Sequence, residues 1–445
     1  MGRIREKFSA SILSTIRARR ESASAPQGEQ PSYASGGLPP AVIREASFSD
    51  FDGVAALKQR WGVAADSMEN WERLWRHNPA LMQQNWERPI GWVLEADGVV
   101  VGYLGNISLL CRYGDRTLTA VASHALVVDP PYRAIGVSLV AAFFRQKSAD
   151  LFVSTSAIES VGRMALAFKC SPVPQPDYGT VLFWVLKPHP FVRALMKKLE
   201  LKPAVSRIVG ALTSAAIGTD RMIGRRRPRR PSAAFSTSEI SVNEIGDKFQ
   251  TLWMQKLNEN PRLLTDRSPA ALRWHYEIPG DRGSVRVLCC HQNGELCGFA
   301  VVRSDTDEQS GLNKSIIADI IVRHDDGDVA AALCFAAYDY AQRLGSHVLE
   351  VVGFPDHIRN VCEQGNPYRR KLPACPFFYK SANPAFDRTL LNSNAWYACP
   401  FDGDATLIRP SYSRPALREG SGMRIAADKV EIVPHVLKRA RTQAS

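Results

Sequence analysis

The stretch "VVDPPYRAIGVSLV", Val127–Val140, is the most informative segment for the fold. An apolar, strand-like run is stopped by Pro130-Pro131, because proline cannot donate to a strand ladder, and an apolar, helix-like run follows. The order of these signals predicts a strand, a short loop and a helix. The first N–H groups of a helix are unpaired and attract anions, so the stretch is either a phosphate-binding loop or a purely structural corner.

The same order of signals occurs twice along the chain. The first half has a hairpin signal, "WVLEADGVVVGYLG", turning at Asp97-Gly98, and the second half has "VRVLCCHQNGELCGFAVV", turning at Asn293-Gly294. A helical segment precedes each hairpin ("WERLWRHNP", "LRWHYEIP"), and a strand, an apolar helix and a further strand follow it. We therefore expect an α/β (α+β) fold of two tandem units, each a mixed, largely antiparallel twisted sheet flanked by helices.

The corner in the second half differs in its charge. It reads "VRHDDGDVAAAL", with Asp325, Asp326 and Asp328 where the first corner has uncharged residues beside Arg133. Carboxylates repel a phosphate, so only the first corner is suited to one. The second unit is expected to be a degenerate copy that shapes a substrate cleft or braces the first unit.

Composition shifts divide the chain into five parts. These are a basic, Ser/Pro/Gly-rich arm expected to be disordered (1–40), a first unit (41–200), a basic linker with "RRRPRR" (201–235), a second unit (236–412) and a basic tail (413–445). The net charge of +12 is concentrated in the arm, linker and tail. Because the two units are near neutral, specific nucleic-acid binding is disfavoured, while weak contact of the basic segments with anionic surfaces stays open.

The nine cysteines include no Cys-x-x-Cys pair, which favours free thiols in a reducing compartment and no metal site. No apolar run is long enough to span a membrane, and the N-terminal segment has no continuous apolar core of a secretory signal. A cytoplasmic location is expected.

The first corner also resembles a known family. Strand, "Arg133-Ala134-Ile135-Gly136-Val137-Ser138" and helix are similar to the Arg/Gln-x-x-Gly-x-Gly/Ala loop of the GNAT (GCN5-related N-acyltransferase) superfamily, with Ser138 replacing the last small residue. By element order the resemblance covers most of residues 41–410. Tandem members with "LW…NP" helices and a late "WY…DGD" look similar to this chain, and several are associated with bacterial polysaccharide metabolism.

The resemblance implies roles for individual residues. Acyl-CoA, most simply acetyl-CoA, would be held by the strand backbone at Leu126, Val127 and Val128 and by the loop residues Arg133, Ala134, Ile135, Gly136, Val137 and Ser138. Gly136 is expected to take backbone angles that other residues avoid. His124 is the candidate base, Glu159 and Tyr178 are further catalytic candidates, and Ala165 stands where the family often has a tyrosine acid.

Each of these candidates has a structural alternative. His124 can be a core histidine, Glu159 a solvated carboxylate at a helix start, and Tyr178 a packing residue. Asp402 and Asp404 in "WYACPFDGDATL" can bind a cationic or sugar acceptor in a cleft between the units, or form a turn.

The function expected from these features is that of an acyltransferase of the GNAT N-acetyltransferase type. It would transfer an acyl group from acyl-CoA directly to the amine or hydroxyl of a small-molecule or carbohydrate acceptor, such as a sugar or polysaccharide precursor. Two alternatives stay open: a non-catalytic tandem binding protein, and an aminoacyl-tRNA-dependent peptidyl transferase of related fold. The Arg133–Ser138 loop favours coenzyme A over tRNA, and the basic linker favours tRNA.

Overall fold

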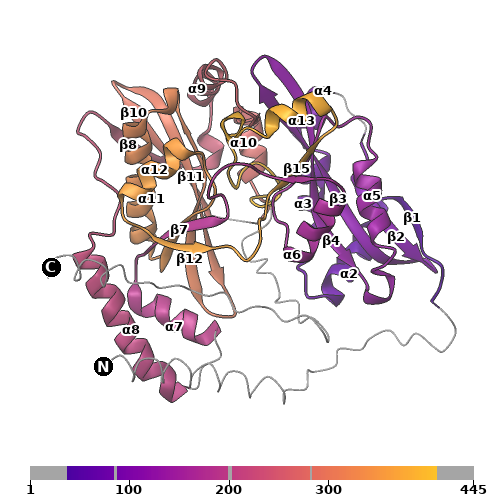
Figure 1. Cartoon of the computed structure of the whole chain (residues 1–445), viewed down its shortest axis with the longest axis horizontal. Coiled ribbons are helices and arrows are strands. Elements are labelled where there is room, and N and C mark those ends of the chain that lie inside the picture. Colours follow the sequence, from indigo (N-terminus) through magenta and orange to yellow (C-terminus); the bar gives the residue numbers. More distant parts are fainter. Residues whose placement is uncertain (1–37, 85–87, 199–202, 281–282, 408–445) are drawn as a thin grey trace, which may run out of the picture. The chain divides into compact units, whose positions relative to one another are not determined.

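The computed structural model describes residues 38–84, 88–198, 203–280 and 283–407. The predicted basic tail and all but the last three residues of the predicted arm lie outside these ranges. The described residues from Ala41 onward form two β-sheets flanked by helices, which confirms the expected fold class (Figure 1). No helix in the described ranges combines the length and apolar character needed to cross a membrane.

The first sheet has eight strands, seven of them in the order β1-β2-β3-β4-β5-β15-β6, with β9 pairing on β3. Their bounds are β1 (Val42–Glu45), β2 (Gly91–Ala96), β3 (Val99–Tyr113), β4 (Arg116–Val128), β5 (Leu151–Ser154), β6 (Ser171–Pro172), β9 (Leu264–Thr265) and β15 (Phe378–Ser381). The pair β4–β5 is parallel, and the other pairs are antiparallel.

Helices cover both faces of this sheet. They are α2 (Phe51–Arg60), α3 (Met68–Trp75), α4 (Pro79–Gln84), α5 (Val137–Phe144) and α6 (Glu159–Ala167). Trp71 and Trp75 of α3 are buried on one face, as their i, i+4 spacing predicts: Trp71 stacks on Tyr103 of β3, and Trp75 contacts Trp71 edge-to-face. On the other face Leu139 and Phe143 of α5 pack against the sheet.

The second sheet has seven strands in the order β14-β7-β13-β12-β11-β10-β8. Their bounds are β7 (Thr180–Val185), β8 (Ser236–Ile240), β10 (Val285–Gln292), β11 (Glu295–Asp307), β12 (Leu312–Val322), β13 (Val348–Val351) and β14 (Tyr368–Lys371). The helices that flank it include α9 (Asp247–Leu257), α10 (Pro269–Tyr276), α11 (Gly327–Leu344) and α12 (Asp356–Gln364), while α13 (Pro384–Leu390) follows β15.

Both predicted hairpins are present. Asp97 and Gly98 have φ of 47° and 75° between β2 and β3, and Asn293 and Gly294 have 52° and 84° between β10 and β11. Two consecutive residues with positive φ match the right-handed twist of the strands that they join, which explains the Asp-Gly and Asn-Gly sequences.

Each sheet takes in strands from the other half of the chain, which the sequence did not indicate: β9 and β15 join the first sheet, and β7 joins the second. β7 precedes the linker but pairs with β13 and β14, whereas β15 follows the second sheet's strands but pairs with β5 and β6. In Figure 1, β7 lies among the orange strands of the second sheet although its colour marks it as earlier in the chain. Neither half of the chain can therefore complete its sheet from its own residues.

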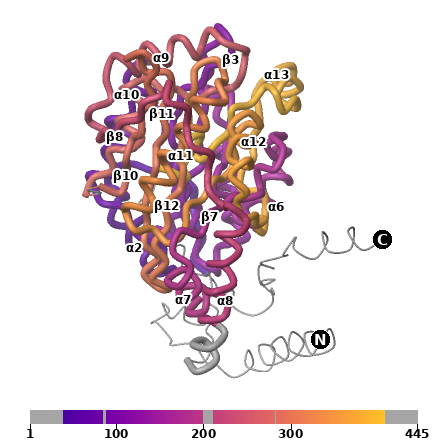
Figure 2. The backbone as a smooth tube through the Cα atoms, turned by 90° about the vertical axis from the view of Figure 1, so that its left-hand side faces the viewer, coloured from indigo at the N-terminus to yellow at the C-terminus, as the bar shows by residue number. Residues whose placement is uncertain are grey.

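The predicted basic linker contains a long helix. α7 (Pro188–Lys198) and α8 (Pro203–Ile223) pack on each other, and Val192, Met196 and Ile217 form a small core with Phe183 of β7. Figure 2 shows the two helices side by side at one end of the view.

Candidate active site

β4 and β5 separate partway along their length. They pair in parallel only at Ala120–Ala122 with Leu151–Val153, while β4 continues to Val128. The register of β4 against β3 shifts in this region, and Ala125 has a φ of 52°. Such a bulge bends the strand away from its neighbour. We call the region beyond Ala122 and Val153 the β4–β5 fork.

An apolar pocket lies at this fork, on the face covered by α5 and α6. It encloses about 460 Å³ of empty space, part of it open to solvent. Its lining residues are Leu104, Ser123, Leu126, Val140, Phe143, Phe144, Phe152, Val153, Ser154, Val161, Met164, Ala165, Cys170 and Phe378. A mainly apolar pocket with a few polar groups is typical of ligand sites, and we call this pocket the apolar slot. Ala165 lines this pocket at the position where the family resemblance implies a tyrosine, and its small side chain does not fill that space.

The N-terminus of α5 lies directly after β4. Gly136 is its N-cap residue, and no side chain caps the helix. The backbone N–H groups of Ile135 and Gly136 donate to the Tyr132 carbonyl, but no described residue accepts a hydrogen bond from the N–H of Ala134 or Val137. An uncapped helix start with free N–H groups attracts an anion.

The expectation for the backbone of Gly136 is wrong. Its φ of −54° and ψ of −22° are ordinary helical values. The position of Gly136 is crowded, since a Cβ there would lie 3.0 Å from Val128 Cγ2 and 3.2 Å from the Arg133 carbonyl oxygen. The Ser138 hydroxyl donates to the Ile135 carbonyl, so it belongs to the turn, whereas Arg133 is exposed.

His124 of β4 is 3% exposed and lies between two carboxylates. Its Nδ1 is 3.5 Å from Asp404 Oδ2, and its Nε2 is 4.0 Å from Asp66 Oδ2. These distances are longer than those of good hydrogen bonds, and each carboxylate lies beside a different ring nitrogen. Burial lowers the pKa of His124, but Asp404 and Asp66 together outweigh burial and raise it above the usual 6.5.

Asp66, between α2 and α3, is held by two further groups. Lys58 Nζ lies 2.5 Å from its Oδ2, and Asn70 Nδ2 donates to its Oδ1 at 2.9 Å. Burial raises the pKa of Asp66, but His124 and Lys58 lower it well below its usual range, so the carboxylate stays ionised. This buried charge cluster was not predicted from the sequence.

Asp404 reaches the fork from the C-terminal part of the described chain. It is 1% exposed, and it accepts hydrogen bonds from Thr155 Oγ1 at 3.1 Å and Ser156 Oγ at 3.0 Å, just after β5. A Cβ on Gly403 would lie 2.1 Å from Thr155 Oγ1, so this close approach requires glycine. Asp404 thus links His124 on β4 to the residues that follow β5.

Asp402 has other partners, Arg267 and Cys399. It accepts hydrogen bonds from an Arg267 guanidinium nitrogen at 3.3 Å and from the Cys399 backbone N–H at 2.8 Å, and Arg267 also pairs with Asp319 of β12. Both aspartates expected to line a cleft between the units are buried, and Asp402 lies in the wall of a pocket with Leu109 and Leu151 of the first sheet.

Tyr103 adds an unexpected polar atom beside His124. Its hydroxyl is buried and has no hydrogen-bond partner among the described residues. A Cβ on Gly105 would lie 2.8 Å from this hydroxyl and 3.2 Å from His124 Cδ2, so the two side chains flank the glycine. Burial, with a contribution from Asp66, raises the pKa of Tyr103 well above its usual value, so the phenol keeps its proton.

The structure does not bring the other two catalytic candidates to this cluster. Glu159 is exposed at the start of α6 and forms an i, i+4 ion pair with Arg163 at 2.6 Å. Tyr178 is buried and packs edge-to-face on Phe377 at 5.5 Å. These positions match the structural alternatives for both residues.

The corresponding fork in the second sheet, beyond Ile317 of β12 and Val351 of β13, is occupied by side chains of the chain itself. The Tyr397 hydroxyl donates to the Ile320 carbonyl, and Lys256 Nζ donates to the Val322 carbonyl at 3.0 Å. The polar groups of the diverging strand therefore have internal partners.

The helix start at this second fork is also occupied. The carboxylate of Asp326 accepts hydrogen bonds from the Asp328 and Val329 N–H groups, which caps α11. Asp325 lies 2.7 Å from Lys256 and 2.5 Å from Arg262. An aspartate of the chain thus takes the place that an anion would take at α5.

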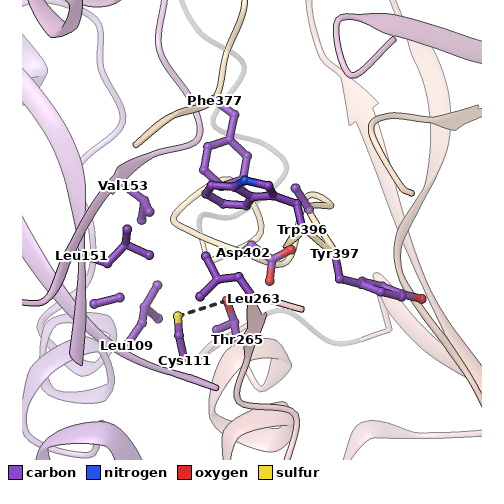
Figure 3. Close-up of a pocket in the computed structure, with 12 residues that line it drawn as sticks. Leu109, Cys111, Leu151, Val153, Leu263, Thr265, Phe377, Trp396, Tyr397 and Asp402 are labelled. Atoms are coloured by element: carbon purple, nitrogen blue, oxygen red, sulfur yellow. Dashed lines mark hydrogen bonds between the residues drawn. The ribbon is translucent and has the colours of Figure 1, made fainter. Parts of the chain in front are cut away.

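A second pocket lies on the opposite face of the first sheet from α5 (Figure 3). It encloses about 290 Å³, including open space, and its wall is mainly apolar, with Leu109, Leu151, Phe377 and Trp396. Its polar groups are engaged: Cys111 contacts Thr265, and the Tyr397 side chain extends away from the pocket. Asp402 also lines the pocket, and its carboxylate accepts hydrogen bonds from Arg267 and the Cys399 N–H. The arrangement indicates packing between the sheets.

No family model matches the chain, and no curated protein matches its sequence. Its structural neighbours include GCN5-related N-acetyltransferases. One from Anabaena variabilis is 11% identical with a TM-score of 0.48, and the match covers 77% of this chain and 73% of the neighbour's chain. One from Kribbella flavida is 10% identical with a TM-score of 0.45, covering 77% and 71%; Eis1 from Mycobacterium abscessus is 12% identical with a TM-score of 0.45, covering 79% and 76%. These scores describe a loose likeness and do not establish a shared substrate.

Proposed function

We propose that the chain is an acyl-CoA-dependent acyltransferase whose single active site is the β4–β5 fork. The observation that carries the proposal is the arrangement around this fork. An apolar slot lies on one face, an uncapped helix start follows β4, and the His124–Asp404 pair stands where the strands diverge. These are the parts that a pyrophosphate, a pantetheine arm and an attacking acceptor require.

In this proposal the α5 N-terminus and Arg133 hold the pyrophosphate, and the apolar slot lined by Leu126 and Phe152 holds the pantetheine arm. When bound, acyl-CoA supplies a thioester, whose carbonyl carbon bonds to the acceptor nitrogen or oxygen while the carbon–sulfur bond breaks. The electron pair leaves with the coenzyme A sulfur, which takes a proton from solvent.

His124 accepts the proton that the attacking amine or hydroxyl loses. It can do so only in its neutral form. Asp404 stabilises the imidazolium that results, and Asp66, kept ionised by Lys58, does the same from the other side. Tyr103 is a candidate donor because its hydroxyl keeps its proton beside His124. Glu159 and Tyr178 have no part in this mechanism.

The acceptor class rests on the family resemblance alone, which implies an amine or hydroxyl on a sugar or polysaccharide precursor. A cytoplasmic location is part of the proposal, because acyl-CoA is available there and the nine cysteines are free thiols, eight of them buried.

One observation favours the non-catalytic alternative. His124 is 3% exposed, and Asp404 occupies the fork beside it, so an acceptor has to displace side chains to reach the ring. A tandem binding protein that holds acyl-CoA without transferring the acyl group would need no such access.

Two measurements test the proposal together. Saturating acetyl-CoA should raise the melting temperature, since a ligand at 100 times its Kd stabilises by about 2.7 kcal/mol. Thiol release should then appear with some member of a panel of amines, amino sugars and hydroxyl acceptors. A shift in melting temperature without thiol release supports the non-catalytic binding protein. No shift at millimolar acetyl-CoA would contradict both the acyltransferase and the binding protein.

A further inference from the structure

The exposed face of α8 is apolar over more than three turns. Its exposed residues are Ala211, Leu212, Ala215, Ala216, Thr219, Met222 and Ile223, a spacing that keeps them on one side of a helix. Leu212, Met222 and Ile223 are 68%, 82% and 78% exposed. Ile217 lies on the other side, packed against α7.

An arginine cluster follows this face directly. Arg225, Arg227, Arg229 and Arg230 are exposed. The residues between the exposed arginines fix the segment to the fold. Arg226 Nε donates to Asp220 at 2.7 Å, and its guanidinium lies 4.2 Å from the Tyr368 ring centre. Pro228 is buried against Gly365. The exposed arginines are therefore presented from an anchored segment.

We propose that this surface, formed by the α8 face and the four exposed arginines, docks on an anionic lipid bilayer. The apolar side chains would enter the boundary between headgroups and acyl chains, and the guanidinium groups would contact the acidic headgroups. The helix would lie in the plane of the bilayer surface.

Charge and polarity together select this occupant. A nucleic acid complements the arginines but gains nothing from Leu212, Met222 and Ile223. The chain's own arm and tail are net basic, and a second copy presents the same positive cluster, so each of these is repelled. A bilayer with acidic headgroups complements both the charge and the apolar face.

Vesicle flotation with the full-length chain tests the proposal. We expect binding to phosphatidylcholine vesicles that contain phosphatidylglycerol, and at least about tenfold less binding to pure phosphatidylcholine. Replacing Arg225, Arg227, Arg229 and Arg230 by Gln should lower binding to the acidic vesicles by about tenfold or more. The double variant Leu212→Ser with Ile223→Ser should weaken it by a similar factor through loss of apolar burial.

A matched control removes the same charge elsewhere. Lys147, Lys169, Lys248 and Arg388 are exposed and lie outside the proposed surface. Replacing these four by Gln should change binding less than about twofold, because the proposed contact is local. Each variant is first shown to melt like the parent chain.

Four outcomes overturn the proposal. These are absence of vesicle binding, binding that does not depend on acidic lipid, a control variant that loses as much binding as the arginine variant, and parent-level binding by the Leu212/Ile223 variant. Binding of polyuridylate that needs the arginines, with no vesicle binding, would instead assign the cluster to nucleic acid.

Discussion

In the first half of the chain the N-cap residue of α5 is Gly136, which offers no side chain to the helix. In the second half the N-cap residue of α11 is Asp326, whose carboxylate accepts hydrogen bonds from two backbone N–H groups. The strands that lead into these helices differ in the same sense. The β4–β5 fork opens on an apolar pocket, while Tyr397 and Lys256 bind carbonyls of β12 at the second fork. Of the two similar corners, the first therefore has room for the proposed ligand, whereas the second is filled by side chains of the chain itself.

The two strands also match in register. His124 pairs with Gly105, three residues after Gly102, and Asp319 pairs with Val301, three residues after Gly298. Each carries a buried titratable group to the Asp402–Asp404 bend: His124 contacts Asp404, and Asp319 contacts Asp402 through Arg267. Arg267 neutralises the second position with a permanent charge, whereas the first position keeps a group that can exchange a proton near neutral pH.

The largest expected effect follows from this difference. His124→Ala should lower kcat/KM by about a thousandfold through loss of the base, with little change in the KM for acetyl-CoA. The matched control is His357→Ala, because burial lowers the pKa of His357 to about 4 and it lies 3.1 Å from Asp325 at the second fork. Equal losses in both variants, measured by thiol release, would show that neither histidine is a base.

The next largest effect is expected when the first corner receives an aspartate at the N-cap position of its helix, as the second corner has at Asp326. Gly136→Asp places a carboxylate at the α5 N-terminus, and it should weaken acetyl-CoA binding by about a hundredfold through blocking and charge repulsion. Gly136→Ala supplies only the steric part, set by the 3.0 Å approach to Val128, and should cost less. Thermal shift against acetyl-CoA concentration separates the two; equal affinities would contradict the assignment.

The pH dependence of the rate should follow His124. Since Asp404 and Asp66 raise its pKa above the usual 6.5 and the base acts when neutral, kcat/KM should rise with pH to a plateau through a midpoint above 6.5. Asp404→Asn removes one of these charges, so the midpoint should move to lower pH and the plateau should fall by about tenfold. A midpoint that is unchanged in Asp404→Asn would exclude the pair.

The smallest effect is expected at the second corner. Asp326→Ala removes the cap of α11 and should cost about 1 kcal/mol of stability, without creating a second acetyl-CoA site, because Tyr397 and Lys256 still occupy the strand carbonyls. Thermal melting with and without acetyl-CoA checks both parts. A new binding event in this variant would mean that Asp326 alone closes the second corner.

Local sequence signals predicted what is local in the structure. The Asp-Gly and Asn-Gly turns, the tryptophans of α3 and the strand–loop–helix corners all depend on neighbouring residues, and the structure has them. The angles of Gly136 were mispredicted because a glycine can serve space as well as conformation. Its close neighbour Val128 comes from the preceding strand, and the motif gives no sign of that contact.

Contacts between distant residues could not be predicted in this way. β7 and β15 are runs of six and four residues whose sequences carry no signal of the sheet that they join, so their pairing depends on contacts across the whole fold. The cluster of His124 with Asp66 and Asp404 joins three separate segments, one of them 280 residues away. Lys58 and Asp66 belong to no recognisable sequence motif. Two opposite charges eight residues apart do not by themselves indicate a buried ion pair.

The central claim is that one corner binds acyl-CoA and its duplicate does not. Calorimetric titration of the full-length chain with acetyl-CoA tests it most directly. We predict one acetyl-CoA per chain, with binding lost in Gly136→Asp and kept in Asp326→Ala. Absence of binding, two sites per chain, or binding that is lost in Asp326→Ala but kept in Gly136→Asp would contradict the account.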